Sequence, residues 1–271
     1  MTALASQRQA VILDELDRLG AVRVSRLVEK LGVSDMTVRR DLDALAQRGL
    51  VTKVHGGAMA VSDRSNDEPG FEAKQVRAQV EKDAIARTAA ELISPGAAVG
   101  ISAGTTTWTL AHIVRDIPGL TVVTNSMRVA DVVLSSGRRD QTVVLTGGIR
   151  TPSDALVGPV AVEALRSLHL DIVFLGVHGV DERSGFTTPN LMESETNRAL
   201  VEAGRRLVVV ADHTKWGMVG LSTIVPLDAA DVFITDDEMP AGALAVLAEH
   251  VGDVIVARSS GAELPGRSDA R

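Results

Sequence analysis

The chain has 271 residues, 45% of them hydrophobic, and a formal net charge of −7 at pH 7, so it is long enough for two domains and one large core. It contains no cysteine, which excludes disulfides and thiolate chemistry, and only 2% aromatic residues, which argues against a stacking platform for single-stranded nucleic acid. Neither a secretory leader nor an apolar run of 18 residues is recognisable, so we expect a cytoplasmic protein without a membrane partner.

Three short helical patterns follow one another in the first fifty residues. Ile12, Leu16 and Leu19 lie at helical spacing and predict a first helix that ends at Gly20. A second, shorter helix is expected after Ser25, because leucine and valine residues again recur at helical spacing there. A third helix follows after a tight break in the chain, so the segment has the order of a three-helix unit.

The third helix, which runs to Leu45, carries the clearest functional signal. Ser34 stands where an N-cap residue is expected, and Val38, Leu42 and Leu45 form one buried stripe. The other faces then carry polar side chains, namely Thr37, Arg39, Arg40 and Asp43. Two helices joined by a tight turn, the second of them cationic, are typical of a helix-turn-helix, whose second helix lies in the major groove of DNA.

A short basic hairpin is expected directly after this helix. Residues 50–52 and 53–55 can pair as two small strands that end at Gly56-Gly57, which would complete a winged helix. An ordinary three-helix bundle with a surface arginine pair is the alternative, but it does not account for the cap, the stripe, the arginine pair and the basic wing in this order. We therefore expect double-stranded operator DNA as a partner. The predicted contacts are Ser34, Thr37, Arg39, Arg40, Asp41, Lys53, His55 and Gly56.

Charge divides the chain into two parts. The formal net charge is +2 for residues 1–60 and −9 for the remaining residues. A small basic unit therefore precedes an acidic body, whose charge discourages non-specific DNA contact. Residues 60–70 are polar and are broken by Pro69 and Gly70, as in a linker. We predict a winged helix-turn-helix DNA-binding domain over residues 1–59, a linker over 60–70, a larger domain over 71–258 and a disordered tail over 259–271.

Helical and apolar segments alternate through the larger domain. A helical pattern covers residues 71–93 and stops at residues 94–96, Ser-Pro-Gly. Seven runs rich in valine and isoleucine follow, as expected for strands buried on both faces of a sheet. They cover residues 97–101, 121–124, 142–146, 172–176, 207–211, 232–235 and 254–257. The segments between them are long enough for crossover helices, so the alternation predicts an α/β fold with a mostly parallel sheet.

Polar, glycine-rich loops follow five of these strands. The carboxyl ends of parallel strands share one edge of the sheet, where ligands bind in open α/β folds. Gly104, Thr105 and Thr106 open a helix and can hold an anion, while Lys215 can add positive charge. Each feature alone is also typical of a helix cap, a turn or a solvated surface, but five such loops at one edge favour a ligand site. The candidate residues in these loops are Ser102, Gly104, Thr105, Thr106, Asn125, Gly147, Gly148, His178 and Lys215.

Both parts of the chain resemble the DeoR-type repressors of sugar metabolism. In the N-terminal part the resemblance rests on Ser34, residues 37–42, Lys53 and the His-Gly-Gly run at residues 55–57. In the larger domain it rests on residues 104–106, 124–126, 145–148, 157–159, 171–179, 195, 211–212 and 215. It implies a sensor domain with a ribose-phosphate-isomerase-like fold, a phosphorylated sugar as effector and Glu195 as a further effector-binding residue. The chain departs from the family at Ser102, where the family usually has an aspartate.

This resemblance leads us to expect a repressor of a carbohydrate-metabolism operon, with operator affinity controlled by the bound sugar phosphate. A single head of charge +2 contacts few DNA phosphates, so we expect a homo-oligomer, either a dimer or a tetramer, whose contacts come mainly from the larger domain. No cofactor is expected. A metal-sensing regulator is disfavoured, because cysteine is absent and the six histidines are scattered.

An enzyme is the alternative in another functional class. A sugar-phosphate isomerase fused to a DNA-binding domain would need a positioned general base, for which Glu195, Asp212 and His178 are the candidates. The sequence shows no acidic cluster that matches an isomerase motif, and the DNA-binding head makes ligand binding a sufficient role. We therefore expect no enzymatic activity.

Overall fold

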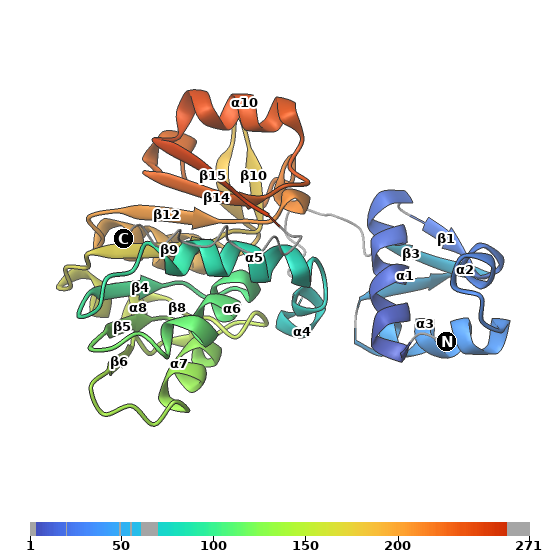
Figure 1. The fold of residues 1–271 in the computed structure, drawn as a ribbon, viewed down its shortest axis with the longest axis horizontal. Coiled ribbons are helices and arrows are strands. Elements are labelled where there is room, and N and C mark those ends of the chain that lie inside the picture. The colour runs from blue at the N-terminus through green and yellow to red at the C-terminus, as the bar shows by residue number, and fades with distance from the viewer. Residues whose placement is uncertain (1–3, 20, 49, 55, 61–69, 259–271) are drawn as a thin grey trace, which may run out of the picture.

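The computed structural model describes residues 4–19, 21–48, 50–54, 56–60 and 70–258. Figure 1 shows a small N-terminal unit, drawn in blue, and a larger α/β unit that contains the rest of the described chain. No helix within these ranges is long and apolar enough to cross a membrane. The predicted linker and tail lie almost entirely outside the described residues.

Three helices of the N-terminal unit pack on one apolar core. They are α1 (Ala5–Leu19), α2 (Val24–Leu31) and α3 (Asp35–Gln47). All three were predicted from the spacing of apolar residues, and their existence is confirmed. The predicted stripe of α3, formed by Val38, Leu42 and Leu45, is at most 1% exposed and packs with Ile12 and Leu16 of α1. Because this stripe faces inward, the opposite face of α3 is left to solvent.

A three-stranded antiparallel sheet completes the N-terminal unit. Its strands are β1 (Ala21–Arg23), β2 (Val51–Val54) and β3 (Gly57–Ala60), in the order β1-β3-β2. The predicted pairing of residues 50–52 with 53–55 is wrong. β2 runs on through Val54 and pairs with β3, because Gly56, at a φ of 78°, makes the turn. Gly57 lies inside β3, where a Cβ would collide with the carbonyl oxygen of Val22 in β1.

The segment predicted as one helix over residues 71–93 contains two helices. α4 (Phe71–Gln75) and α5 (Gln79–Ala90) meet at residues 76–78, which we call the α4–α5 corner. The backbone of Ala78 has a φ of 47° there, a conformation that is uncommon for alanine. Apolar spacing continues across the corner, so the sequence pattern did not reveal the break.

Seven strands form the central sheet of the larger unit. They are β4 (Ala98–Ile101), β5 (Thr121–Thr124), β6 (Thr142–Leu145), β9 (Ile172–Gly176), β12 (Leu207–Val210), β14 (Val232–Asp236) and β15 (Asp253–Ala257). Every pairing between them is parallel, and their order is β15-β14-β12-β9-β4-β5-β6. The seven predicted strands and the α/β fold class are confirmed.

Helices cover both faces of this sheet (Figure 1). α5, α6 (Thr105–Val114) and α7 (Met127–Leu134) contribute to one core, while α8 (Pro159–Arg166), α9 (Leu191–Glu202) and α10 (Ala241–His250) contribute to the other. Within β12, Val208 and Val210 belong to the first core and Leu207 and Val209 to the second. Burial on both faces explains why the strands appear in the sequence as continuous apolar runs.

The order of the strands defines where a ligand site is expected. β5 and β6 extend the sheet from β4 toward one edge, whereas β9, β12, β14 and β15 extend it toward the other. The carboxyl ends of β4 and β9 are therefore the topological switch point, the place where open α/β sheets bind ligands. We call the surface formed by the carboxyl ends of the strands the strand-end site.

Two small sheets, which the sequence did not predict, follow the carboxyl ends of β6 and β9. One is the hairpin of β7 (Ile149–Arg150) and β8 (Leu156–Val157). The other contains β10 (Gly179–Asp181), β11 (Gly185–Thr188) and β13 (Ser222–Val225). A short 3₁₀ helix, η1 (His213–Lys215), follows β12, and a second, η2 (Leu227–Ala229), precedes β14.

Candidate functional site

The start of α3 is built as its sequence predicts. Ser34 is the N-cap: its Oγ accepts a hydrogen bond from the backbone N–H of Thr37 at 3.3 Å and lies 2.9 Å from the Thr37 hydroxyl. Arg39 and Arg40 follow on the exposed side of the helix. The N-terminal half of α3 therefore presents polar and cationic groups to solvent.

The exposed cations of this unit differ in their surroundings. Nε of Arg39 lies 2.5 Å from the Asp35 carboxylate one turn earlier, and Lys53 of β2 forms an ion pair with Asp43. Arg40 makes no ion pair with any residue in the described part of the chain. Its guanidinium is therefore the cation of α3 that can reach a partner without leaving an intramolecular carboxylate. Gly56 is exposed at the turn of the hairpin, and His55 lies outside the described residues.

Asp41 requires a correction. It is only 4% exposed, and its carboxylate forms two hydrogen bonds with Arg8 of α1, from Nε at 2.7 Å and from Nη2 at 3.2 Å. A carboxylate held in this way joins α1 to α3 and does not face DNA. The sequence pattern placed Asp41 within the arginine-rich run but could not reveal a partner 33 residues earlier.

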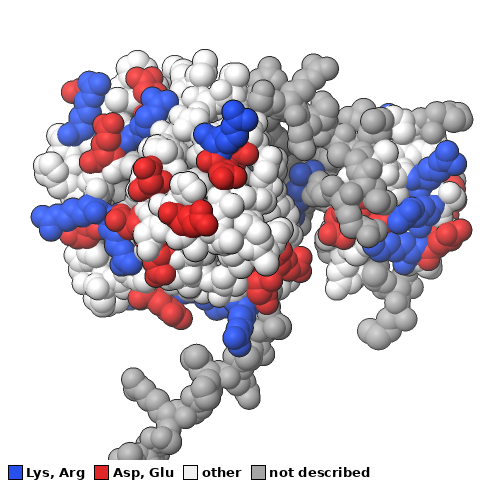
Figure 2. Space-filling view, turned by 90° about the horizontal axis from the view of Figure 1, so that it is seen from above, with Lys and Arg blue, Asp and Glu red and all other residues white. Residues whose placement is uncertain are grey.

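Charges on the larger unit are mixed. Figure 2 shows acidic and basic side chains interspersed on its visible face, without a broad basic surface there. On this face the larger unit does not offer a second surface of the kind that attracts DNA phosphates.

Two of the predicted effector residues hold the switch point together. Ser102 is completely buried, and its Oγ accepts a hydrogen bond from the N–H of Gly176 at 2.9 Å, which joins the ends of β4 and β9. Asn125 is 1% exposed: Oδ1 accepts from the N–H of Ala103 at 2.9 Å, and Nδ2 donates to the carbonyl of Leu156 at 3.3 Å. Both side chains therefore fix the loops of the strand-end site, and their polar atoms are already used within the protein.

The first turn of α6 is the part of this edge best suited to an anion. Gly104 is its N-cap, and among the described residues no side chain accepts a hydrogen bond from the first N–H groups of the helix. Thr105 and Thr106 form the first turn and are each 7% exposed. Free N–H groups at a helix N-terminus, together with the positive end of the helix dipole, favour a bound anion.

Gly147 and Gly148 are explained by the backbone that follows them. Both have positive φ angles, 74° and 121°. A Cβ on Gly148 would lie 2.5 Å from the carbonyl oxygen of Val157 in β8. Gly148 is thus required for the β7–β8 hairpin to close, whether or not a ligand approaches.

The structure separates two glutamates of α9 that the sequence did not distinguish. Glu195, the predicted effector residue, is exposed to solvent. Glu193 is buried instead, and its carboxylate accepts hydrogen bonds from the hydroxyls of Thr151 and Thr188, both at 3.0 Å, and of Ser153. We therefore remove Glu195 from the candidate site. The Asn190 N-cap three residues before Glu193 was the available signal.

His178 and Lys215 are both half-buried near the carboxyl ends of their strands. His178 lies between β9 and β10, where its backbone N–H donates to the carbonyl of Thr187 at 3.0 Å. Lys215 ends η1, directly after β12. It lies close enough to the buried Asp212 for its charge to lower the pKa of that carboxyl.

A buried lysine that sequence reasoning missed interacts with Asp212 and Lys215, and we call these three residues the lysine–aspartate cluster. Lys82, in the first turn of α5, is only 2% exposed. Burial lowers the pKa of Lys82 to about 8, and the charge of Asp212 opposes this shift. Burial also tends to raise the pKa of Asp212, but the charges of Lys215 and Lys82 outweigh it, so that pKa is lowered. The charges of the two lysines thus favour the ionised form of the Asp212 carboxylate.

The free energy of unfolding of the larger unit should rise with pH between about 8 and 10.5. Lys82 has a pKa of about 8 in the folded chain against 10.5 for an ordinary lysine, so the unfolded state binds more protons in this window. The stabilisation is complete above about pH 10.5, is lost as the pH falls through about 8, and amounts to about 3 kcal/mol. Lys82→Met should lack this slope, and no tyrosine or cysteine titrates alongside.

Urea unfolding followed by the fluorescence of Trp108 and Trp216 measures this slope, because both tryptophans lie in the larger unit. Stability curves of the wild type and Lys82→Met that run parallel from pH 7.5 to 10.5 would contradict it.

A histidine next to this cluster is tied to a buried aspartate. Nδ1 of His213 lies 2.8 Å from Oδ1 of Asp236, and its backbone N–H donates to Oδ2 at 2.7 Å. The hydrogen bond to Asp236 raises the pKa of His213. These contacts join the end of β12 to the end of β14. Among the described residues, no group of three or more histidine, aspartate or glutamate side chains is arranged to hold a metal ion.

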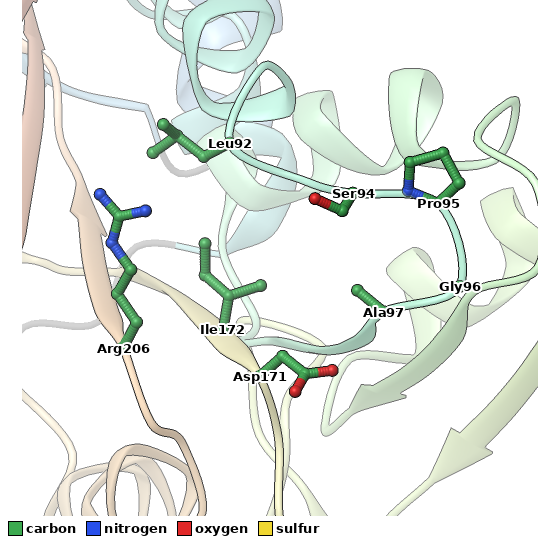
Figure 3. Close-up of a pocket in the computed structure, with 8 residues that line it drawn as sticks. All are labelled: Leu92, Ser94, Pro95, Gly96, Ala97, Asp171, Ile172 and Arg206. Atoms are coloured by element: carbon green, nitrogen blue, oxygen red, sulfur yellow. The ribbon is translucent and has the colours of Figure 1, made fainter.

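A surface cavity of about 410 Å³ lies at the opposite edge of the sheet (Figure 3). It is lined by residues near the amino ends of β4, β9 and β12, among them Ala97, Asp171 and Arg206. The Asp171 carboxylate already accepts a hydrogen bond from the N–H of Ala98 at 2.8 Å. This cavity is separate from the strand-end site and contains none of the predicted effector residues.

Comparison with known proteins identifies the two units. Residues 8–64 match the DeoR-like helix-turn-helix domain, and residues 77–237 match the DeoR C-terminal sensor domain. An uncharacterised HTH-type transcriptional regulator of Escherichia coli K12 is 35% identical over 93% of this chain and 98% of its own. A putative aga operon transcriptional repressor of E. coli O157:H7 is 33% identical over 93% of both chains. The glycerol-3-phosphate regulon repressor of E. coli K12 is 31% identical over 90% of this chain and 96% of its own.

A solved structure of ribose 5-phosphate isomerase A from Neisseria gonorrhoeae is 14% identical and covers 50% of this chain and 52% of its own, with a TM-score of 0.37. The matched domains define the class of protein: a transcription regulator with an N-terminal helix-turn-helix and a C-terminal sensor domain. The chain belongs to the DeoR family.

Proposed function

We propose that this protein represses a carbohydrate-metabolism operon and that a phosphorylated sugar bound at the strand-end site controls its affinity for operator DNA. The observation that carries the proposal is the presence, in one DeoR-family chain, of a capped helix with two exposed arginines and a switch point with an uncapped helix N-terminus. Two relatives are named as repressors of an aga operon and of a glycerol-3-phosphate regulon. With this DNA-bound role we propose a cytoplasmic location.

The effector contacts follow from the charges and donors at this edge. The phosphate lies against the N–H groups of Gly104, Thr105 and Thr106, with Lys215 as its cation. His178 and Gly147 border the sugar moiety. Ser102, Asn125 and Gly148 act indirectly, because the protein itself uses their polar atoms or their lack of a side chain.

The DNA contacts come from the exposed side of α3 and from the hairpin that follows. Ser34, Thr37 and Lys53 bind the sugar–phosphate backbone, with His55 and Gly56 at the hairpin turn. One of the two arginines, Arg39 or Arg40, contacts base edges, and the other binds a phosphate. Residues 1–59 then form the DNA-binding domain, residues 60–70 the linker and residues 71–258 the sensing and oligomerisation domain.

We propose that the sensor domain binds its ligand without turning it over. Of the three candidate bases, Glu195 is exposed on α9, and Asp212 is 1% exposed and interacts electrostatically with two lysines. A general base must reach the proton that it removes. Turnover assays with pentose and hexose phosphates test this proposal, and measurable isomerisation that is lost in a His178→Ala variant would contradict it.

Four exposed apolar side chains suggest how two copies of the chain associate. Ile149, Val160, Leu191 and Met192 are 57%, 63%, 64% and 40% exposed. The Cβ position of Gly158 lies 3.7 Å from Cδ1 of Ile149 and 3.9 Å from Sδ of Met192, and Cγ1 of Val160 lies 3.7 Å from the Cβ position of Gly147. Leu191 precedes Met192 at the start of α9. We call these four side chains the apolar cluster. A second copy that covers the cluster would bring two helix-turn-helix heads onto one operator.

The variant Val160→Glu/Leu191→Glu should be monomeric at about 10 μM, where the wild type sediments as a dimer or a larger oligomer. Two carboxylates in the apolar cluster oppose burial of the interface, because a charge buried without a partner is costly. Leu134→Glu is the matched control: Leu134 is equally exposed, at 63%, but lies on α7, against the other face of the sheet. Sedimentation velocity distinguishes the species. A monomeric wild type, or a double variant that keeps the wild-type mass, would refute this interface.

A further inference from the structure

The α4–α5 corner is held in place by Lys82. Its ammonium group donates hydrogen bonds to the backbone carbonyls of Lys74, at 2.6 Å, and of Arg77. α4 has only five residues, too few for a helix to be stable on its own, and Ala78 has a left-handed backbone. The corner therefore depends on contacts from outside, and the buried Lys82 supplies two of them.

Lys82 also connects the corner to the strand-end site. It interacts electrostatically with Asp212, the N-cap of η1, and with Lys215 at the end of η1. The proposed effector phosphate lies next to Lys215. Charges that are removed from water interact strongly, so an anion at this position alters the field that holds the Lys82 ammonium against the corner.

A second contact joins α4 to the same site. The ring of Phe71, in α4, packs edge-to-face on Trp108 of α6 with ring centroids 5.7 Å apart. The first turn of α6 is the proposed phosphate site. α4 thus contacts α6 through Phe71, and its Lys74 carbonyl accepts a hydrogen bond from Lys82, which interacts electrostatically with η1.

The corner in turn contacts the DNA-binding unit. Val76, the first residue of the corner, packs against the apolar core of the helix-turn-helix, which includes Val38 and Leu42 of α3. A change in the position of the corner therefore alters the packing against the unit that carries Arg39 and Arg40. The proposed path therefore consists of an electrostatic step from η1 to Lys82, the hydrogen bonds of Lys82 to the carbonyls of Lys74 and Arg77, and the packing of Val76 against the helix-turn-helix core.

We propose that Lys82 is a positioning residue that transmits occupancy of the strand-end site to the DNA-binding head, by holding or releasing the α4–α5 corner. This inference rests on the proposed function, since it names the residue through which the effector acts. Ligand binding changes operator affinity only if the ligand prefers one arrangement of the corner over the other.

The test compares the full-length wild type with Lys82→Met, Val76→Ser and Arg87→Met. Arg87 is the matched control, because it is a cation on α5 that is exposed to solvent. The operator is a duplex selected by the wild-type protein from random sequences. Its affinity is measured with and without glycerol 3-phosphate, ribose 5-phosphate, fructose 6-phosphate or inorganic phosphate. Hydrogen–deuterium exchange over residues 74–82 is recorded without ligand.

For the wild type and Arg87→Met we expect an active phosphate compound to change operator affinity by about 5- to 150-fold. Lys82→Met and Val76→Ser should reduce this change to less than about twofold, although they still bind the compound in calorimetry. Lys82→Met should also speed amide exchange at the corner, whereas Arg87→Met should not. Loss of coupling with retained binding is a result that general destabilisation does not produce.

A folded Lys82→Met protein with the wild-type coupling ratio, or with wild-type exchange at the corner, would overturn the inference and leave the proposed function intact. If no compound changes the operator affinity of the wild type, the proposed function fails, and the exchange measurement still decides whether Lys82 holds the corner. Should Lys82→Met fail to fold, Val76→Ser decides, because that substitution leaves Lys82 in place. Wild-type coupling in Val76→Ser would contradict the path to the head.

Discussion

Arg40→Ala should weaken operator binding by about 5- to 150-fold and relax the preference at one base position, as loss of a bidentate contact to a base costs about 1–3 kcal/mol. Arg40 lies on the exposed side of α3 and makes no ion pair with another described residue. Arg39→Ala should cost less and weaken all sequences alike, because Arg39 already pairs with Asp35. Fluorescence anisotropy with the operator and its single-base variants measures both effects.

Arg166→Ala is the control for this prediction. Arg166 is an exposed arginine of the sensor domain that pairs with Glu163, so its removal changes the charge by the same amount far from α3 in the sequence. Operator binding by the Arg40→Ala protein equal to that of Arg166→Ala would show that Arg40 does not read DNA.

Lys215→Glu should abolish the response of operator affinity to the sugar phosphate. Replacing a cation by an anion beside the phosphate exchanges attraction for repulsion, which at an effective dielectric constant of about 20 is worth several kcal/mol. The variant also places a carboxylate near Asp212, whose pKa the wild-type lysine lowers. Titration of the protein–operator complex with ligand measures the response.

The control is Arg183→Glu, the same reversal of charge at an exposed position in the turn between β10 and β11. It should respond to ligand as the wild type does. A Lys215→Glu protein that responds at the wild-type ligand concentration would remove Lys215 from the effector site.

The regular elements could be predicted because their apolar patterns are local. The stripe of Val38, Leu42 and Leu45 specifies α3, and continuous valine-rich runs specify the seven strands, since both patterns report burial within a short window. The small sheets had no such pattern. β7 and β8 are two residues each, and β13 pairs with β11 across more than thirty residues of chain.

The errors at the candidate sites have two causes. The sequence did not show which face of a helix points inward, and it did not show interaction partners that are far away in the sequence. Glu193 and Glu195 differ by two residues, or about 200° around the helix axis, so the sequence does not say which one faces inward without an exact helix phase. The buried Asp41 carboxylate is paired with Arg8, and the buried Lys82 ammonium donates to the carbonyls of Lys74 in α4 and Arg77 in the corner. No local sequence pattern predicts a buried ion pair or a buried lysine, because the group that offsets the cost of burying the charge belongs to another element.

The central claim is that a phosphorylated sugar at the strand-end site changes the affinity for operator DNA. The most direct measurement is the dissociation constant of the full-length protein for its selected operator across the panel of phosphate compounds, with the dephosphorylated sugars as controls. We predict that at least one phosphorylated compound changes this constant by about 5- to 150-fold and that its dephosphorylated form does not. A constant that stays the same across the panel, although calorimetry shows the compounds to bind, would contradict the claim.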